Sequence, residues 1–352
     1  MRGRKPNVVF LNQSERPVEW FMRGPSLAKI EKLGWAIRRN ETGRKLEPEE
    51  WAEEIADADA VMTTWSSPRL DEVVLGKNRN LKIVAHVGGS VAPYIGGEVY
   101  RRGIRVTSSN KAMARTVAES TLMLILMGMR RIHLRGSFGT RSKPMEWGKD
   151  KSIRVPQDCR IGIWGYGDIS AWLVKLLRPF EPREILVNSG HLSEEAARRE
   201  GMRKVEFDDL FAESHVVVCL AGMTVANTGR VGEEQLASIP DDGVLVNVGR
   251  APLIQPDALM DELRRRRITG VFDVFEEEPL PEEDPLYSLD NVILTPHCAG
   301  SGRDASYMAE MLEEIERCLE GKQLKYEIPR ERARTMTDLG TVREAQKKGR
   351  NS

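Results

Sequence analysis

This chain of 352 residues contains few cysteines and has no formal net charge. The four cysteines, Cys159, Cys219, Cys298 and Cys318, are widely spaced and form no CxxC pair. We therefore expect reduced thiols, with neither a disulfide framework nor a metal site. Lys+Arg and Asp+Glu both number 53, so the formal net charge is zero. That balance argues against a nucleic acid or an anionic membrane as the main partner.

Long apolar runs are also missing. The longest, from Thr121 to Met129, is far shorter than a membrane span. The apolar run before Asn12 is too brief for the core of a signal peptide, so we expect a cytoplasmic protein. The length of the chain exceeds what one compact core usually holds, and two domains are therefore expected.

What the sequence does contain is a regular alternation of short apolar runs and helical patterns. Nearly continuous apolar strands between helices indicate parallel sheets covered on both faces, so the predicted fold class is α/β with two doubly wound parallel-sheet domains. Strands are expected at 7–11, 60–64, 81–87, 104–109, 160–164, 184–188, 216–220, 244–248, 270–274 and 292–295, and helices at 114–134, 168–180, 256–267 and 302–322. We expect a loop at 135–149 and a loosely ordered charged tail at 331–352.

The stretch "GYGDIS", residues 165–170, follows one of these strands and opens an amphipathic helix. In that context, two glycines favour a dinucleotide cradle, in which backbone N–H groups at the helix N-terminus hold a pyrophosphate. The third glycine of the usual fingerprint is replaced by Ser170. A tight turn without a ligand is the alternative. The candidate cofactor residues are Gly165, Tyr166, Gly167, Asp168 and Ile169.

The choice of nucleotide depends on the end of the next strand, where the sequence reads "NSGH" from Asn188 to His191. A carboxylate at this place usually binds the adenosine ribose and repels a 2′-phosphate, but none is present. We therefore predict NAD or NADP as the cofactor, with a slight preference for NADP, and Asn188 and Ser189 as binding residues. Asn188 could equally end the strand and bind a ribose hydroxyl of NAD.

Three polar residues each follow the C-terminal end of a predicted strand, which is the edge of a parallel sheet where ligands bind. They are Arg250 in "LVNVGRAPLIQPDAL" (245–259), Glu278 in "DVFEEEPLPEEDPLYSLDNVILT" (273–295) and His297 in "TPHCAG" (295–300). Taken singly, each is more often a surface or structural residue. Together, and in this order, the three stretches resemble the D-isomer-specific 2-hydroxyacid dehydrogenase family.

A hydride transfer between NAD(P)H and a small 2-oxo acid explains these residue types. Arg250 can bind both the carboxylate and the carbonyl oxygen of such an acid. His297 can give a proton to that oxygen, while Glu278 orients the imidazole and favours its protonated form. Glu277 is the other acid available in this motif, and we choose Glu278 because it directly precedes the proline, as the family's acid does.

The resemblance implies further site residues. Asp273 and Thr116 are assigned to the nicotinamide side of the cofactor, although Thr116 could equally be no more than an N-terminal helix residue. Val248 is assigned to cofactor binding. The family's substrate loop reads "GGSVAP" here, so that Ser90 and Ala92 replace a Gly and an Asp. Backbone N–H groups of Gly89, Ser90 and Val91 are implied to bind the substrate carboxylate.

The resemblance also implies the domain plan. A Rossmann cofactor domain, residues 111–299, is inserted in a flavodoxin-like substrate domain made of residues 1–110 and 300–330. A homodimer is implied, with the helix at 114–134 a contributor, and no nucleic acid or membrane partner. The alternative function is that of a nucleotide-sensing interaction protein, similar to the family's co-repressor members. The 2-hydroxy acid itself cannot be read from the sequence.

Overall fold

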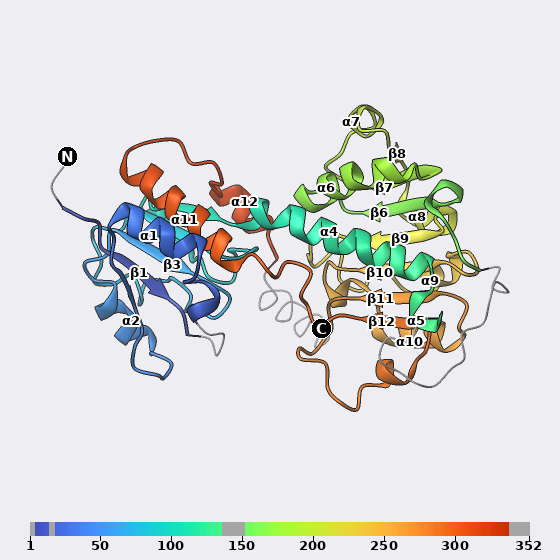
Figure 1. Ribbon diagram of the computed structural model, residues 1–352, viewed down its shortest axis with the longest axis horizontal. Coiled ribbons are helices and arrows are strands. Elements are labelled where there is room, and N and C mark those ends of the chain that lie inside the picture. The colour runs from blue at the N-terminus through green and yellow to red at the C-terminus, as the bar shows by residue number, and fades with distance from the viewer. Residues whose placement is uncertain (1–3, 14–17, 136–151, 338–352) are drawn as a thin grey trace. The chain divides into compact units, whose positions relative to one another are not determined.

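The structure is a computed structural model that describes residues 4–13, 18–135 and 152–337 (Figure 1). The chain forms two compact units, one of residues 1–113 with 301–352 and one of residues 114–300. The expected boundaries, after residues 110 and 299, fall close to these. Most of the expected loop at 135–149 lies outside the described residues.

The sheet of the first unit has five parallel strands in the order β2-β1-β3-β4-β5. This is the flavodoxin-like order, with the first strand between the second and the third. Four of the strands match the predicted runs, whereas β2 is too polar and too short to stand out in the sequence. The strands are β1 (Val8–Leu11), β2 (Ile37–Arg39), β3 (Ala60–Thr63), β4 (Ile83–His86) and β5 (Arg105–Ser108).

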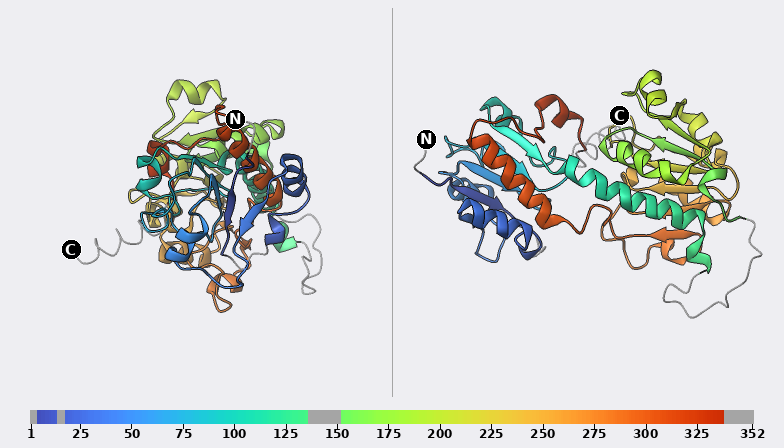
Figure 2. Two further views of the ribbon diagram at one scale, coloured as in Figure 1. Left: turned by 90° about the vertical axis from the view of Figure 1, so that its left-hand side faces the viewer. Right: turned by 45° about the horizontal axis from the view of Figure 1, so that its top comes forward.

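Alternate side chains of these strands enter two separate cores, as the pleat of a strand requires. On one face, helices α1 (Pro25–Leu33) and α11 (Asp304–Leu319) lie side by side, and α11 packs its Tyr307 and Met311 on the sheet (Figures 1 and 2). The other face is covered by α2 (Pro48–Glu54), α3 (Gly97–Arg101) and α12 (Arg330–Thr335). The short 3-10 helix η1 (Val18–Trp20) completes the helices of this unit.

The start of the tail that we expected to be loosely ordered, residues 331–352, forms helix α12, whereas residues 338–352 lie outside the described residues. Ala333 is buried in the core of the first unit and Met336 packs against it. Before this helix, the chain runs beside β5, where Thr107 and Glu327 form an antiparallel bridge and Ile328 N donates to Val106 O. Two apolar residues among charged neighbours are too few to show a helical pattern in the sequence.

The second unit contains a seven-stranded parallel sheet in the order β12-β11-β10-β9-β6-β7-β8. Successive strands are added toward one edge from β6 to β8 and toward the other edge from β9 to β12, so the strand order reverses between β6 and β9, as in a Rossmann fold. Thus the predicted fold class is confirmed for both units. The strands are β6 (Arg160–Trp164), β7 (Glu184–Asn188), β8 (Arg203–Lys204), β9 (Val216–Cys219), β10 (Val244–Asn247), β11 (Thr269–Phe272) and β12 (Val292–Leu294); β8 was not foreseen.

Helices cover both faces of this second sheet (Figure 1). One face carries α4 (Asn110–Met129), α6 (Asp168–Leu177) and α7 (Glu194–Arg199), and the other carries α8 (Phe207–Glu213), α9 (Glu233–Ser238) and α10 (Pro256–Arg264). Short connecting helices are α5 (Ile132–Arg135), η2 (Pro156–Asp158), η3 (Arg178–Phe180), η4 (Ala251–Leu253) and η5 (Pro285–Ser288).

Helix α4 differs from the predicted helix at 114–134. It starts earlier, at Asn110, and ends at Met129, because Arg131 takes a left-handed conformation with φ 48° before α5 begins. Among the described residues, α4 alone is long and apolar enough to cross a membrane by composition. However, it packs on the sheet so closely that a Cβ at Gly128 would lie 2.6 Å from Val244 Cγ1, as expected of a core helix.

Candidate active site

The cradle predicted at residues 165–170 is a turn that requires its first glycine. Gly165 has φ 94°, and a Cβ there would lie 2.5 Å from the Cα of Ala221 in the chain after β9. Gly167 is the N-cap of α6, and a Cβ there would meet nothing within 4 Å. The turn therefore presents accessible backbone at the N-terminus of a ten-residue helix, which suits a pyrophosphate.

Ser170 replaces the third glycine without opening the turn. Its side chain is buried, and its hydroxyl donates to the carbonyl oxygen of Gly165 at 2.8 Å. The serine therefore ties the first turn of α6 to the glycine that starts the cradle. A missing glycine is compensated here by a hydrogen bond across the loop.

The ribose candidates lie at the end of β7. Asn188 is partly buried, and its side-chain N–H donates to the carbonyl oxygen of Val205 at 2.9 Å. Ser189 is 9% exposed, and its hydroxyl accepts a hydrogen bond from His191 N. The side-chain nitrogen of Asn188 thus makes a structural hydrogen bond, and its side-chain oxygen is the atom left for a ligand.

Two of the three candidate catalytic side chains are in direct contact. His297 Nδ1 lies 2.7 Å from Glu278 Oε2, and Glu278 Oε1 accepts a hydrogen bond from Phe275 N. Burial tends to raise the pKa of Glu278, but the hydrogen bonds from His297 and Phe275 outweigh it and lower the pKa below its usual value. The carboxylate is thus held ionised beside the ring, whereas Glu277 makes no such contact within the described residues.

Asp273 braces the segment that carries His297. This carboxylate is buried at the end of β11, and it accepts hydrogen bonds from Thr295 Oγ1, Cys298 N and Ala299 N at 2.7 to 3.1 Å. The three donors lie on both sides of His297, whose φ of 46° is left-handed. Sequence reasoning assigned Asp273 only to the nicotinamide and missed this role.

Arg250 follows β10 and is positioned by Asn247. The Asn247 side chain donates to Arg250 O and accepts from Gly249 N, while Arg250 Nη1 donates to Gly249 O at 2.6 Å. Burial lowers the pKa of the Arg250 guanidinium, and the nearby charge of Glu278 opposes this effect. The structure therefore brings Arg250 close to the His297–Glu278 pair. Two further cofactor candidates are Val248, buried just before this turn, and Thr116, partly buried on α4.

The candidate carboxylate loop belongs to the first unit and follows β4. The buried hydroxyl of Ser108 shares its one proton between Gly88 O and Gly89 O, at 3.0 and 2.7 Å. Ser90 Oγ donates to the carbonyl oxygen of Thr337 and accepts from Ala92 N. Within the described parts of the chain, no hydrogen bond is made by the backbone N–H groups from Gly88 to Val91. Four consecutive free donors of this kind form a suitable site for an anion.

Comparison with known proteins identifies the class to which this fold and site belong. The model of the D-isomer specific 2-hydroxyacid dehydrogenase NAD-binding domain matches residues 122–299. The chain is 31% identical over 271 residues to a glyoxylate reductase of Korarchaeum cryptofilum, covering 74% of this chain and 80% of that one. It therefore belongs to the D-isomer-specific 2-hydroxyacid dehydrogenase family.

Two solved structures share the fold. A D-isomer specific 2-hydroxyacid dehydrogenase from Xanthobacter autotrophicus Py2, in complex with NADPH and MES, has a TM-score of 0.71 at 24% identity, covering 94% of this chain and 100% of that one. A second, from Lactobacillus delbrueckii ssp. bulgaricus in its NAD-complexed form, has a TM-score of 0.72 at 17% identity, covering 92% and 100%. Both nucleotides thus occur among proteins of this fold.

Proposed function

We propose that this protein reduces a small 2-oxo acid to a 2-hydroxy acid with NADH or NADPH, and catalyses the reverse oxidation. The observation that carries the proposal is the 2.7 Å contact between His297 and Glu278, with Arg250 nearby, at the carboxyl edge of a parallel sheet that also carries the cradle. The match to the dehydrogenase family and the glyoxylate reductase relative support the same reaction class.

The nucleotide fits the residues present. Gly165 and Gly167 give the close backbone approach that a pyrophosphate needs, and the N-terminus of α6 provides N–H groups. When bound, the nicotinamide supplies or accepts the hydride. Asn188 and Ser189 are our proposed ribose contacts, Thr116 and Asp273 our proposed contacts on the nicotinamide side, and Val248 a further proposed cofactor contact.

His297 acts as the proton donor in the direction of reduction. Because its Nδ1 is engaged by Glu278, Nε2 is the nitrogen left to give a proton to the substrate oxygen. Glu278 stabilises the imidazolium form and holds the ring in one orientation. Arg250 binds the carboxylate and the carbonyl oxygen with its planar donors, and offsets the negative charge that develops on that oxygen. The free N–H groups of Gly89, Ser90 and Val91 bind the carboxylate.

The test is oxidation of NADH and NADPH by the purified protein across a panel of acids that includes glyoxylate, pyruvate and hydroxypyruvate. We expect turnover of at least one acid, measured as a loss of NADH or NADPH absorbance. Binding of nucleotide without turnover of any acid would contradict the proposal. Activity restricted to NADH or NADPH would settle the cofactor.

For the cofactor, we expect a weak preference for NADPH that Asn188→Asp reverses. A carboxylate near a 2′-phosphate repels it by about 1 to 4 kcal/mol, depending on the effective dielectric, so the NADPH/NADH ratio of kcat/KM should fall at least about fivefold. The variant also loses the Asn188 hydrogen bond to Val205 O. Asn188→Ala is therefore the matched control, since it loses the same bond without adding charge. Equal ratios in the two variants would place residue 188 away from the ribose.

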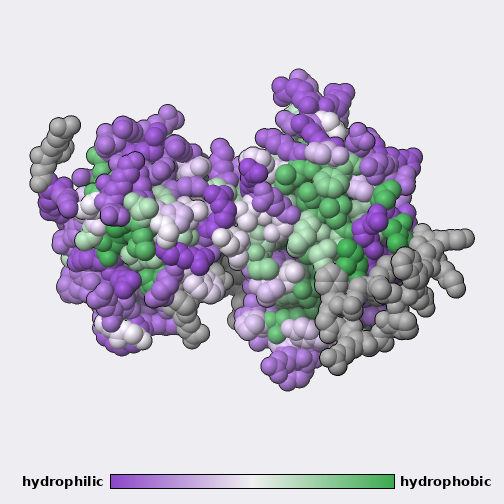
Figure 3. All heavy atoms as spheres, in the orientation of Figure 1, coloured by the Kyte–Doolittle hydropathy of each residue, from purple (hydrophilic) through white to green (hydrophobic). Residues whose placement is uncertain are grey.

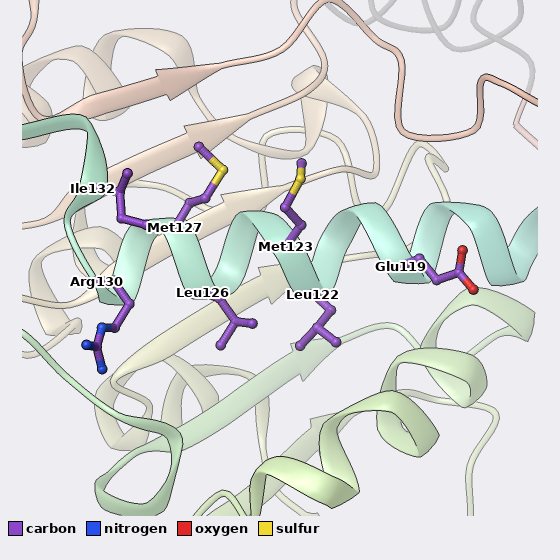
Figure 4. A pocket seen from close by; sticks show the side chains of 7 residues that line it. All are labelled: Glu119, Leu122, Met123, Leu126, Met127, Arg130 and Ile132. Carbon is purple, nitrogen blue, oxygen red and sulfur yellow. The ribbon is translucent and has the colours of Figure 1, made fainter. Parts of the chain in front are cut away.

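We propose a homodimer in which α4 packs against its symmetry copy. Leu122, Met123 and Leu126 line a pocket along this helix, and Met123 is 49% exposed (Figure 4). Hydrophobic side chains gather on this face of the unit (Figure 3). Glu119 and Arg130 flank the apolar residues at opposite ends. In an antiparallel two-fold pairing, each Glu119 faces the partner's Arg130.

Leu126→Glu is expected to convert this dimer to a monomer, because it places two like charges at the centre of the paired helices. The measurement is the mass in solution by light scattering. Val225→Glu is the control, since Val225 is an apolar residue that is 63% exposed and does not belong to α4. An unchanged mass for Leu126→Glu, or a monomeric wild type, would contradict the assignment.

A further inference from the structure

His86 is a buried histidine directly below the candidate carboxylate loop. It is the last residue of β4, two residues before the first free N–H of that loop, and its side chain is fully buried. Its ring stacks on Tyr94 with centroids 4.8 Å apart and an interplanar angle of 25°. Nδ1 lies 3.0 Å from Thr63 Oγ1, whereas Nε2 is buried without a partner among the described residues.

The hydrogen bonding favours one tautomer of this ring. If Nδ1 accepts the Thr63 hydroxyl proton, only the Nε2–H donor is left unpaired. If Nδ1 donates instead, both the hydroxyl proton and the Nε2 lone pair are left unpaired in the interior. Since buried unpaired groups are costly, the ring proton is placed on Nε2. Burial lowers the pKa of His86 to about 3, so the ring is neutral.

The Nε2 atom faces the backbone of Gly88. A Cβ added at Gly88 would collide with the imidazole, its nearest neighbour being Nε2. Gly88 is therefore required by the close approach of the ring, and the ring in turn limits where the loop backbone can lie. On the carbonyl side, Ser108 binds Gly88 O and Gly89 O.

We propose that His86 is a positioning residue for the substrate carboxylate: its neutral imidazole supports the loop from Gly88 to Val91 so that its free N–H groups converge on the anion. The Nε2–H dipole points toward the underside of this loop and adds positive potential where the carboxylate binds. The inference rests on the proposed function. It adds to that function a residue that never touches substrate.

His86→Phe is the first test, because phenylalanine retains the stacking on Tyr94 and removes both ring nitrogens. We expect KM for glyoxylate, or for the best acid of the panel, to rise about five- to tenfold, because the loop loses the support of the ring and the dipole of its Nε2–H, an effect of the size of one ordinary hydrogen bond. kcat should change less than about twofold, and the Kd of NADPH should not change, since the cradle lies in the other unit. Thr63→Val should raise KM in the same direction, and less than additively with His86→Phe.

A suppressor test follows from the contact with Gly88. Gly88→Ala should raise KM more than about tenfold in the wild-type background, and less than about threefold in a His86→Ala background, where the space is free. Tm measurements check that each variant is folded.

Binding of oxamate in the presence of NADPH, measured by calorimetry, tests the role of His86 separately from the proposed catalytic function. If the wild type turns over no acid, the proposed function fails, but the oxamate Kd still tests His86. An unchanged KM and oxamate Kd in folded His86→Phe and Thr63→Val would overturn the inference. Equal effects of Gly88→Ala in both backgrounds, or a fall in kcat as large as the rise in KM, would do so too.

Discussion

Replacing His297 by alanine is expected to lower kcat for 2-oxo acid reduction by about 10²- to 10⁴-fold, the usual range for the loss of a general acid. The loss should fall on kcat much more than on the Kd of the nucleotide, because His297 has no part in the cradle. The measurement is steady-state kinetics with the best acid of the panel, together with nucleotide binding. Turnover near that of the wild type would remove His297 from the mechanism.

The pH dependence provides an independent check on the same residue. Reduction takes a proton from the imidazole, so we expect its rate to fall as pH rises and the rate of oxidation to rise. The lowered pKa of Glu278 means that this carboxylate is ionised at neutral pH, so its own protonation affects the rate only on the acid side. Glu278→Gln removes the charge and preserves the shape. It should lower the rate of reduction, because the charge that supports the proton donor is lost, whereas an unchanged rate would show that Glu278 does not support His297.

Arg250→Lys should weaken 2-oxo acid binding and lower turnover, with kcat/KM reduced by about 10²-fold or more. Lysine keeps the charge, but it loses the planar donors that can bind a carboxylate and a carbonyl oxygen together, and stabilisation of a developing oxyanion is worth about 3 to 4 kcal/mol. The measurement is kcat/KM for the acid beside the Kd of NADPH, which should stay nearly unchanged. Damage to nucleotide binding with the chemistry spared would contradict this assignment.

A matched control for this substitution is available elsewhere in the same unit. Arg230 also lies in the second unit, where its guanidinium packs over the ring of Phe207 with 3.9 Å to the centroid. Arg230→Lys changes the same group in a structural setting. It should leave kcat/KM within about twofold of the wild type, because an exchange away from such a site costs little.

The fold, and the closeness of the catalytic candidates to one another, were predictable because both depend on local patterns. Apolar strands alternating with helices define parallel sheets, and their carboxyl ends share one edge. Arg250, Glu278 and His297 each follow a strand, so their proximity follows from the topology. The resemblance to the family added the proposed roles of these residues, and the match to the family model agrees with the membership.

The supporting contacts could not be predicted, because they depend on side-chain direction and on residues far apart in the chain. Ser90 and Thr337, which share a hydrogen bond, are 247 positions apart. Ser170 looks like a defect in a glycine motif until its hydroxyl is seen to hold Gly165 O. Likewise, nothing in "VAHVGG" shows that the His86 ring lies against Gly88. Helix α12 was missed because its charged composition conceals two buried contacts.

The three hydrogen bonds that Asp273 accepts have a consequence for how inactive variants are interpreted. The backbone conformation at His297 is left-handed, which a non-glycine residue rarely adopts, and it is maintained by a carboxylate 24 positions earlier in the chain. Loss of that carboxylate would leave the histidine present in sequence and intact in chemistry, but free to turn away from its substrate. An inactive variant at position 273 would then look like a failure of proton transfer, although its origin would be the shape of the backbone.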